Sequence, residues 1–207
     1  MKRITLAFTG ASGMGYGLRL LECLLRAGCR VDLLVSSTAR VVARQELDLT
    51  LPADPGELAA FFNGRFAGHA GQLVAYGRDE WFAPVASGSN PADAMVVCPC
   101  TMGALAAIAH GMADNLIERA ADVMLKEKRP LILVPRESPF SLIHLRNMTR
   151  LAEAGATLLP ANPGFYHRPQ SVAQVVDFIV ARILDQLAVP HELMARWGEG
   201  RDQPGTP

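Results

Sequence analysis

The sequence lacks the hydrophobic run that a membrane-spanning helix needs. Half of the 207 residues are hydrophobic, yet none of the apolar runs approaches the roughly 18 residues that cross a bilayer. Lys2 and Arg3 precede the apolar run 4–8, but this run is too short for the core of a signal peptide, and Gly and Ser soon follow it. We therefore expect a soluble, cytoplasmic protein with no membrane partner.

The sequence also lacks an excess of charge of either sign. Twenty basic residues balance twenty acidic ones, so no global field draws the protein to nucleic acid or to anionic lipid. The length is enough to bury a full core, and we expect one domain over residues 1–197. Residues 198–207 carry Gly, Pro and charge without apolar side chains, and we expect a mobile tail there.

Cysteine is scarce, and its spacing argues against disulfides and metal sites. Of the four cysteines, only Cys98 and Cys100 lie close together, with no CxxC or second pair beside them. Cys100 at a predicted helix start could have a lowered pKa, although packing of a reduced thiol is the simpler interpretation. We expect no bound metal, because no ligand spacing connects the histidines, which are His69, His110, His144, His167 and His191.

Short apolar runs alternate with helix-like segments along the chain. The predicted strands cover residues 4–9, 31–35, 94–98, 131–134 and 156–159. Helical patterns lie between or after them, near 16–27, from 36 onward, and near 56–63, 102–112, 115–128, 141–154 and 171–187. Strands that are apolar on both faces and alternate with helices are typical of a parallel sheet covered on both sides. We therefore predict an α/β protein with a three-layer, Rossmann-like fold around a central parallel sheet.

The first predicted strand ends in the glycine-rich turn Thr9–Gly13. Glycines let backbone N–H groups approach a phosphate, and the following helix adds the positive end of its dipole. We therefore expect a cofactor phosphate on this turn, with tight packing as the alternative. The dinucleotide fingerprint GxGxxG is absent, and Asp32 stands too early in the second strand to hold an adenosine ribose. Ser36 and Ser37 occupy the end of that strand, which favours a phosphate monoester over NAD.

The residues after the other predicted strands are also candidates, because ligands of open parallel sheets bind at the carboxyl ends of strands. Thr101 follows the third strand, Arg136 and Glu137 follow the fourth, and the segment 160–166 follows the fifth. Small residues, hydroxyls, a cation and a carboxylate thus gather at one edge, which suits a phosphorylated ligand. An exposed loop ion pair is the alternative interpretation of Arg136 and Glu137.

Several other residues have a plain structural interpretation on pattern alone. Arg119, Asp122 and Lys126 share one helix face, as in a solvated charged surface. Glu46 lies within a helical stretch and reads as a surface residue, whereas Trp81 reads as a core anchor.

The last predicted helix constrains two further candidates, Tyr166 and Arg182. The segment Ser171–Gln174 has the form of a capping box that opens this helix. Arg182 lies eleven residues after Ser171, or roughly 16 Å along the axis. Tyr166 and Arg182 of one chain therefore meet only if residues 163–169 fold back along the helix. The alternative is that a neighbouring subunit supplies one of them.

Motifs spread over almost the whole chain carry a family resemblance. In chain order they are Thr9–Gly13 with Tyr16-Gly17, Cys98-Pro99-Cys100, Glu118–Asp122, Lys126-Glu127, Arg129–Leu131, Val134–Glu137, Pro163–Ser171 and Arg196-Trp197. Together, over about residues 3–198, they resemble the UbiX-type flavin prenyltransferases. The resemblance implies a metal-independent transferase, formerly described as an aromatic-acid decarboxylase. Such an enzyme joins a dimethylallyl group from dimethylallyl phosphate to N5 and C6 of reduced FMN, and the prenylated FMN serves UbiD-type decarboxylases.

The resemblance also implies roles for individual residues. The residues implied to hold FMN are Gly10, Ala11, Ser12, Ser36, Thr101, Met102, Gly103, Ala104 and Arg136. Those implied to hold the prenyl phosphate are Tyr166, Arg182, Arg119 and Lys126. The implied catalytic residues are Ser12 near N5, Glu46 and Glu137 for proton movement or polarisation, and Trp81, which with the loop Ala86-Ser87-Gly88 would line the allyl cation. Ser12 near N5 would put the flavin ring against the first turn, so the alternative is that the phosphate lies on a neighbouring loop. The family assembles as a dodecamer with sites between subunits, which would account for the separation of Tyr166 from Arg182.

Two other functions fit parts of the pattern. An FMN-dependent cysteine decarboxylase would share the fold and the FMN site, but it uses a catalytic His and an Asn-bearing motif that the segment Pro99–Met102 lacks. A non-catalytic flavin carrier would leave Glu137, Tyr166 and Arg182 without a role.

Overall fold

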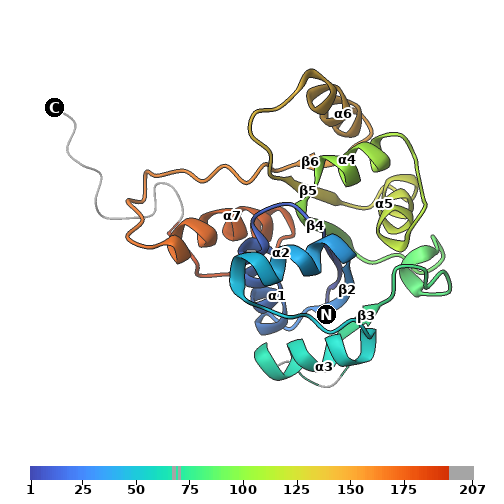
Figure 1. The fold of residues 1–207 in the computed structure, drawn as a ribbon, viewed down its shortest axis with the longest axis horizontal. Helices are drawn as coiled ribbons and strands as arrows, with labels where there is room; N and C mark the ends of the chain where they lie inside the picture. The colour runs from blue at the N-terminus through green and yellow to red at the C-terminus, as the bar shows by residue number, and fades with distance from the viewer. Residues whose placement is uncertain (67–68, 70, 196–207) are drawn as a thin grey trace.

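A parallel sheet forms the centre of the protein, as predicted (Figure 1). The computed structural model describes residues 1–66, 69 and 71–195, and within them six strands pair in the order β3-β2-β1-β4-β5-β6. All neighbouring strands run parallel. The strands are β1 (Arg3–Phe8), β2 (Arg30–Val35), β3 (Leu73–Tyr76), β4 (Ala94–Cys100), β5 (Leu131–Pro135) and β6 (Thr157–Leu158).

Helices cover both faces of the sheet and complete the three layers. One layer contains α1 (Met14–Arg26), α2 (Ser37–Leu47), α3 (Pro55–Phe66) and α7 (Val172–Gln186). The other contains α4 (Met102–Ala109), α5 (Leu116–Lys126) and α6 (Leu142–Glu153), with the short 3-10 helix η1 (Pro84–Ala86) beside α5. Figure 1 shows the second layer at the upper right and the first layer below and to the left of the sheet.

Burial on both faces explains why the strands are continuous apolar runs. In β1, Ile4, Leu6 and Phe8 pack into the layer of α1 and α7, while Ala7 packs into the layer of α4 and α5. Successive side chains of a strand point to opposite faces. A strand covered on both sides therefore buries every residue, and the alternation of a half-exposed strand is lost.

The direction of the strand order changes between β1 and β4. From β1 the chain adds β2 and β3 on one side, and it then returns to add β4, β5 and β6 on the other. The connections leave in opposite directions at this point, so a crevice opens at the carboxyl ends of the two strands. Thr9 holds the two ends together: its hydroxyl donates to the Pro99 carbonyl at 2.8 Å and accepts the Thr101 N–H at 2.8 Å.

The predicted elements are confirmed, with one omission and one change. The strand β3 was not predicted, because its four residues lie in the irregular stretch 52–92. The capping box at α7 is half formed. The Ser171 hydroxyl accepts the Gln174 N–H, but the Gln174 side chain accepts the backbone N–H of Gln170 instead of that of Ser171. The predicted tail 198–207 and the motif Arg196-Trp197 lie outside the described residues.

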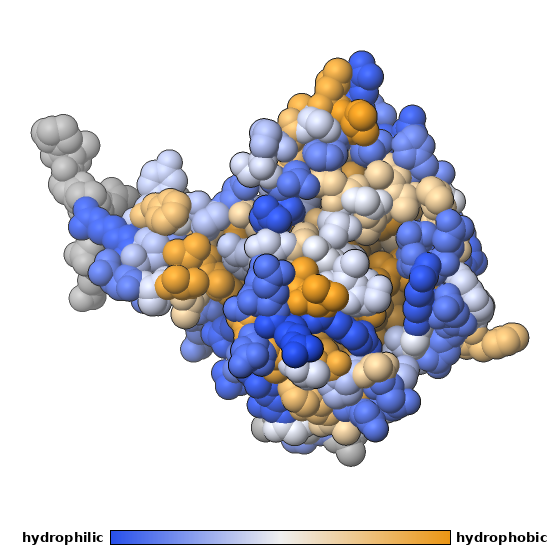
Figure 2. All heavy atoms as spheres, viewed as in Figure 1, coloured by the Kyte–Doolittle hydropathy of each residue, from blue (hydrophilic) through white to orange (hydrophobic). Residues whose placement is uncertain are grey.

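Hydrophobic side chains are also exposed. No helix among the described residues is long and apolar enough to cross a membrane. Apolar side chains gather at the tip of α6 (Figure 2), where Leu142, Ile143 and Leu145 are all exposed. A second group lies on and after the coil that Figure 1 shows leaving the sheet between β6 and α7, and it contains Phe165, Tyr166 and Val172.

Candidate functional site

A pocket of about 270 Å³ opens at the carboxyl ends of the strands, beside the switch point. Ligand sites usually measure roughly 300–1,000 Å³, so this pocket is large enough for one end of a cofactor but not for all of it. Its lining comes from the ends of β1 to β4 and the starts of α2, α4 and α5. The lining residues are Thr9, Leu34, Val35, Ser36, Ser37, Thr38, Tyr76, Gly77, Arg78, Thr101, Ala104, Asn115, Leu116, Ile117 and Glu118.

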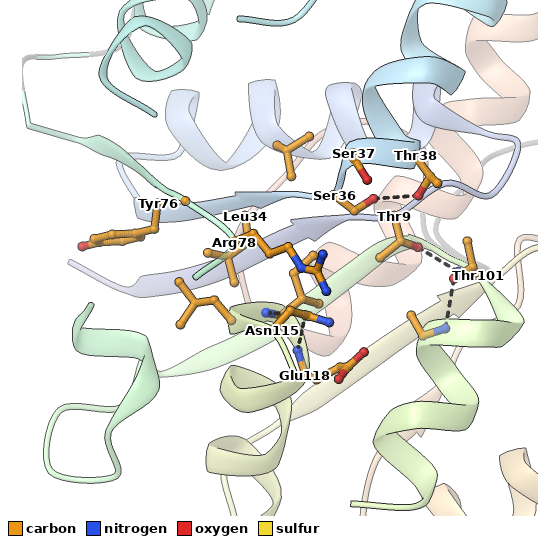
Figure 3. A pocket seen from close by; sticks show the side chains of 15 residues that line it. Thr9, Leu34, Ser36, Ser37, Thr38, Tyr76, Arg78, Thr101, Asn115 and Glu118 are labelled. Atoms are coloured by element: carbon orange, nitrogen blue, oxygen red, sulfur yellow. Dashed lines mark hydrogen bonds between the residues drawn. The ribbon is translucent and has the colours of Figure 1, made fainter. Parts of the chain in front are cut away.

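Three capped helix N-termini meet at this pocket (Figure 3). The Ser36 hydroxyl caps α2 by accepting the Ala39 N–H at 3.1 Å, and the Thr101 hydroxyl caps α4 by accepting the Ala104 N–H at 3.0 Å. Asn115 caps α5 in the same way, through the N–H groups of residues 117 and 118. Helix N-termini attract anions, because their first N–H groups and their dipoles point at the ligand. The pocket is therefore suited to a phosphate.

The N-terminus of α1, where the sequence predicted the phosphate, already holds a carboxylate. Glu46, from the last turn of α2, accepts the N–H of Gly13 at 3.1 Å with each carboxylate oxygen and the N–H of Met14 at 3.0 Å. These are the amides that a phosphate would need at this helix. The pocket beside this turn, at the starts of α2 and α4, is therefore the better anion site, which agrees with the alternative that the flavin ring and not the phosphate lies against the turn. Gly10 has a packing role as well, since a Cβ there would lie 2.5 Å from Thr38.

Glu46 is ionised at neutral pH, and its position ties three parts of the site together. Burial raises the pKa of its carboxyl. Hydrogen bonds from the Ser12 hydroxyl and from the Gly13 and Met14 amides, together with the charge of Arg136, lower the pKa by more than burial raises it. The net pKa lies below the usual value. Glu46 thus fixes the turn that carries Ser12, and it holds a negative charge near Arg136.

Arg136 and Glu137 follow β5 at the same edge of the sheet. Arg136 is half-buried, and its Nε is buried with no hydrogen-bond partner among the described residues. A buried guanidinium nitrogen without an acceptor costs free energy, which a ligand acceptor would recover. Glu137 accepts the Ser138 N–H at 3.3 Å. No ion pair joins Arg136 to Glu137 in the described part of the chain, so the alternative of a loop ion pair was wrong.

One acidic and one nucleophilic residue of the central strands have structural roles. Asp32 is fully buried and accepts from the Arg3 guanidinium at 2.6 Å, and burial raises the pKa of its carboxyl despite that partner. Cys100 is fully buried as well, and burial raises the pKa of its thiol to about 12. The alternative of an activated Cys100 was therefore wrong, because a thiol with this pKa stays protonated at neutral pH.

A second group of predicted site residues lies on the outer face of α5. The Arg119 guanidinium donates to the Ala86 carbonyl at 3.0 Å and pairs with Asp122 at 2.6 Å. Lys126 pairs with Glu127, and a Cβ on Gly88 would clash with both of these side chains. The predicted loop 86–88 therefore does meet Arg119 and Lys126.

The direction of α5 separates Lys126 from the pocket of its own chain. The helix starts at the pocket, with Leu116 in the lining, and ends shortly before β5 begins at the opposite edge of the sheet. Ten residues separate Leu116 from Lys126, which is roughly 15 Å along the helix axis. One chain therefore does not bring Lys126 beside Arg136 and Glu137.

The third group contains Tyr166 and Arg182. The segment between β6 and α7 does fold back onto the helix, since His167 stacks on Phe178 at 5.5 Å and a Cβ on Gly164 would touch the same ring at 2.9 Å. Phe178 lies one turn before Arg182, so the segment approaches Arg182 closely. Both predicted residues are exposed, and Arg182 pairs with Asp185 at 2.6 Å.

The last predicted site residues to be located are Trp81 and the residues at the start of α4. The Trp81 side chain is 45% exposed beside the fully exposed Phe82, so the interpretation of Trp81 as a core anchor was wrong. Met102 is buried under the start of α4, whereas Gly103 is exposed and Ala104 lines the pocket. Sequence reasoning missed Tyr76, Arg78 and Asn115 as lining residues, although the helix-capping pattern around Asn115 could have identified that residue.

No group of three or more His, Cys, Asp or Glu side chains that could hold a metal ion occurs among the described residues. The groups that the site does present are hydroxyls, helix N-termini, guanidinium groups and the carboxylates of Glu46, Glu118 and Glu137. This set is suited to binding an organic phosphate and moving protons.

Comparisons with known proteins agree with this chemistry. The family described as "Flavoprotein" matches residues 1–184. A flavin prenyltransferase UbiX from Pseudomonas aeruginosa is 56% identical over 198 residues, which cover 96% of this chain and 95% of that protein.

Solved structures give the same result. A crystal structure of AnUbiX in complex with FMN and dimethylallyl pyrophosphate is 38% identical, covers 95% of this chain and 97% of that chain, and superposes with a TM-score of 0.84. A dodecameric FMN-dependent UbiX-like decarboxylase from Escherichia coli O157:H7 is 36% identical, covers 91% of this chain and 96% of that chain, and has a TM-score of 0.80.

Proposed function

Because this chain belongs to the UbiX-type flavin prenyltransferases of the Flavoprotein family, we propose that it transfers a dimethylallyl group from dimethylallyl phosphate to N5 and C6 of reduced FMN. The product is prenylated FMN. One observation carries the proposal in this chain. The phosphate pocket adjoins the turn that carries Ser12, and Glu46 and Arg136 lie beside this turn at the same edge of the sheet.

The residues of the crevice fit FMN. Ser36, Thr101 and the first amides of α2 and α4 would hold its phosphate, since the pocket takes only one end of the molecule. The rest of the cofactor would then lie over Gly10, Ala11 and Ser12, with the unpaired Nε of Arg136 donating to it. Thr9 keeps the two halves of this cradle in register through its bonds to Pro99 and Thr101.

The chemistry is a carbon-transfer reaction in which protons are moved but no metal is used. Reduced FMN supplies two nucleophilic atoms, N5 and C6, and the allylic C–O bond breaks with inorganic phosphate as the leaving group. Of the two protons that N5 and C6 release, one ends on the phosphate and the other on the alkene carbon. Glu137 would carry this second proton, and Ser12, held by Glu46, would stay close to N5.

The prenyl phosphate requires cations that one chain does not bring together. Arg119 and Lys126 with residues 86–88 form one group, and Tyr166 with Arg182 forms another. Both groups would stabilise the negative charge that develops on the departing phosphate. We propose that they join the pocket of a neighbouring copy in a dodecamer, where Trp81 would also become covered and line the allyl group. The exposed apolar side chains of α6 support assembly.

Three further expectations belong to the same proposal. The transfer is metal-independent, so a chelator leaves the rate unchanged. The prenylated FMN passes to a UbiD-type decarboxylase as the consuming partner, and the reaction takes place in the cytoplasm.

An anaerobic assay tests the proposal directly. The protein is mixed with reduced FMN and either dimethylallyl monophosphate or dimethylallyl diphosphate, and the extracted flavin is weighed by mass spectrometry. A gain of one C5H8 unit supports the reaction, and the comparison of donors identifies the leaving group. Unchanged flavin under conditions where FMN binds would reject the transfer and favour a flavin carrier. Decarboxylation of a peptidyl cysteine would favour the FMN-dependent cysteine decarboxylase instead.

A further inference from the structure

Arg78 is a pocket residue to which the family motifs assign no role. It follows β3 and lines the phosphate pocket across from Ser36 and Thr101. Figure 3 shows its guanidinium group directed into the pocket, toward Thr9 and Asn115. Among the described lining residues it is the one cation, and Glu118 is the one carboxylate.

The backbone of Arg78 is held in place from two sides. The turn 77–80 closes on itself, because the Glu80 N–H donates to the Gly77 carbonyl at 3.4 Å and the Glu80 carboxylate accepts the Gly77 N–H at 2.9 Å. The Arg78 carbonyl also accepts the Leu116 N–H, at the first residue of α5, at 2.8 Å. A side chain on such a backbone loses less freedom when it binds a ligand.

The guanidinium group of Arg78 makes a weak ion pair within the chain. Its Nε lies 3.9 Å from Oδ1 of Asp79, and both side chains are about two thirds exposed. An ion pair of this length and exposure adds little stability. The Glu118 carboxylate, by contrast, accepts the Asp114 N–H at 2.9 Å. A charged group at the mouth of a phosphate pocket is thus available for a ligand.

We propose that Arg78 is a specificity-determining residue that pairs with the phosphate of FMN and makes the pocket select FMN over riboflavin. The inference rests on the proposed function for the identity of the flavin. A charge-assisted hydrogen bond from a guanidinium to a phosphate is among the stronger polar contacts. Without Arg78 the lining keeps only the negative charge of Glu118, which repels a phosphate dianion but not the neutral end of riboflavin.

Flavin-binding titrations of the full-length protein test this assignment, with dissociation constants measured for FMN and for riboflavin. Arg78→Gln weakens FMN binding about ten-fold and changes riboflavin binding less than about two-fold. Arg78→Lys, which keeps the charge, retains most of the FMN affinity. Raising the salt concentration weakens FMN binding more in the wild type than in Arg78→Gln. The matched control is Arg26→Gln, because the Arg26 side chain is equally exposed, at 67%, and pairs with Glu22 far from the pocket.

Equal losses for both flavins in Arg78→Gln, no loss for FMN, or an equal loss in Arg26→Gln would overturn the assignment. The prenyl transfer is scored separately at saturating FMN, in the wild type and in the control Arg26→Gln, which is expected to turn over at the wild-type rate. A wild-type protein that selects FMN through Arg78 but forms no prenylated flavin would reject the proposed reaction and leave this inference standing.

Discussion

Both carboxylate oxygens of Glu46 lie 3.1 Å from the backbone nitrogen of Gly13. Gly13 is the N-cap residue of α1 and has no side chain to cap the helix, so Glu46 does this from another helix. The contact joins residues 33 positions apart and fixes the turn that presents Ser12. The position of this turn therefore depends on a carboxylate from α2.

Replacing Glu46 with Gln should lower the thermal unfolding midpoint at neutral pH. Its pKa is lowered in the folded protein, so the ionised carboxylate stabilises the fold at every pH above the unfolded value of about 4.5. This contribution disappears as the pH falls through the lower folded pKa. The difference in midpoint between the wild type and Glu46→Gln should therefore be constant above about pH 4.5 and shrink below it. The neighbouring Gln45→Ala is the control and should show no such pH-dependent difference; a constant difference down to pH 3 or so would contradict the assigned contacts.

Two glycines of α1 should differ in how replacement by alanine changes the free energy of unfolding. A Cβ on Gly17 would lie 2.4 Å from the Cys98 carbonyl and 2.8 Å from the Phe8 ring, so Gly17→Ala should destabilise the fold by about 1–3 kcal/mol. A Cβ on Gly15 would meet nothing within 4 Å. Gly15→Ala should therefore be neutral or stabilising by up to about 1 kcal/mol. Denaturant unfolding measures both, and similar effects of the two changes would be inconsistent with this packing of α1 against β1 and β4.

The hydroxyls that cap α2 and α4 should matter for both stability and FMN binding. Ser36→Ala and Thr101→Ala each remove a cap and should cost about 1 kcal/mol of unfolding free energy. Both should also weaken FMN binding, because they loosen the amides around the pocket. The control is Ser141→Ala, which removes the equivalent cap from α6 away from the pocket. It should cost similar stability and leave FMN affinity unchanged; weakened binding in that variant would mean that the cap losses act globally.

Mixing two inactive variants should restore activity if sites are shared between copies. Glu137→Gln disables the carboxylate after β5, and Arg182→Gln disables a cation on α7. If each site takes these residues from different subunits, random mixed oligomers contain both intact residues at about one quarter of their sites. Prenylated FMN formed by co-expressed variants, measured against each variant alone, checks this. Activity that stays at the level of the single variants would place both residues in one subunit's site.

The sequence predicted the fold well because the information needed is local. Burial on both faces makes each strand a continuous apolar run, and glycine at position 28 ends α1 in the left-handed region, with φ of 74°. The strand β3 is the exception, since its four residues, Leu73–Tyr76, are too few to show a period. Such a short strand is stabilised by its neighbours β2 and α3 instead of by its own pattern.

The candidate site was predicted in part. Strand-end reasoning found Ser36, Thr101, Arg136 and Glu137, because parallel strands present their ends at one edge. It did not find the occupant of the α1 N-terminus, since nothing in the segment around Glu46 indicates a contact with Gly13. It also did not show that α5 carries Lys126 away from Arg136, because the direction of a helix relative to the sheet follows from the assembled topology.

The sequence by itself determined the α/β class, the order of the elements and the chemistry available at the strand ends. These properties depend on residue type and periodicity along the chain. Only the tertiary structure decided which helix N-terminus is free for a phosphate and which is already capped by Glu46. It also decided that Arg78 faces the pocket. The reason is physical: a charge contributes through its distance and exposure to other groups, and those distances are set when segments far apart in the chain pack together.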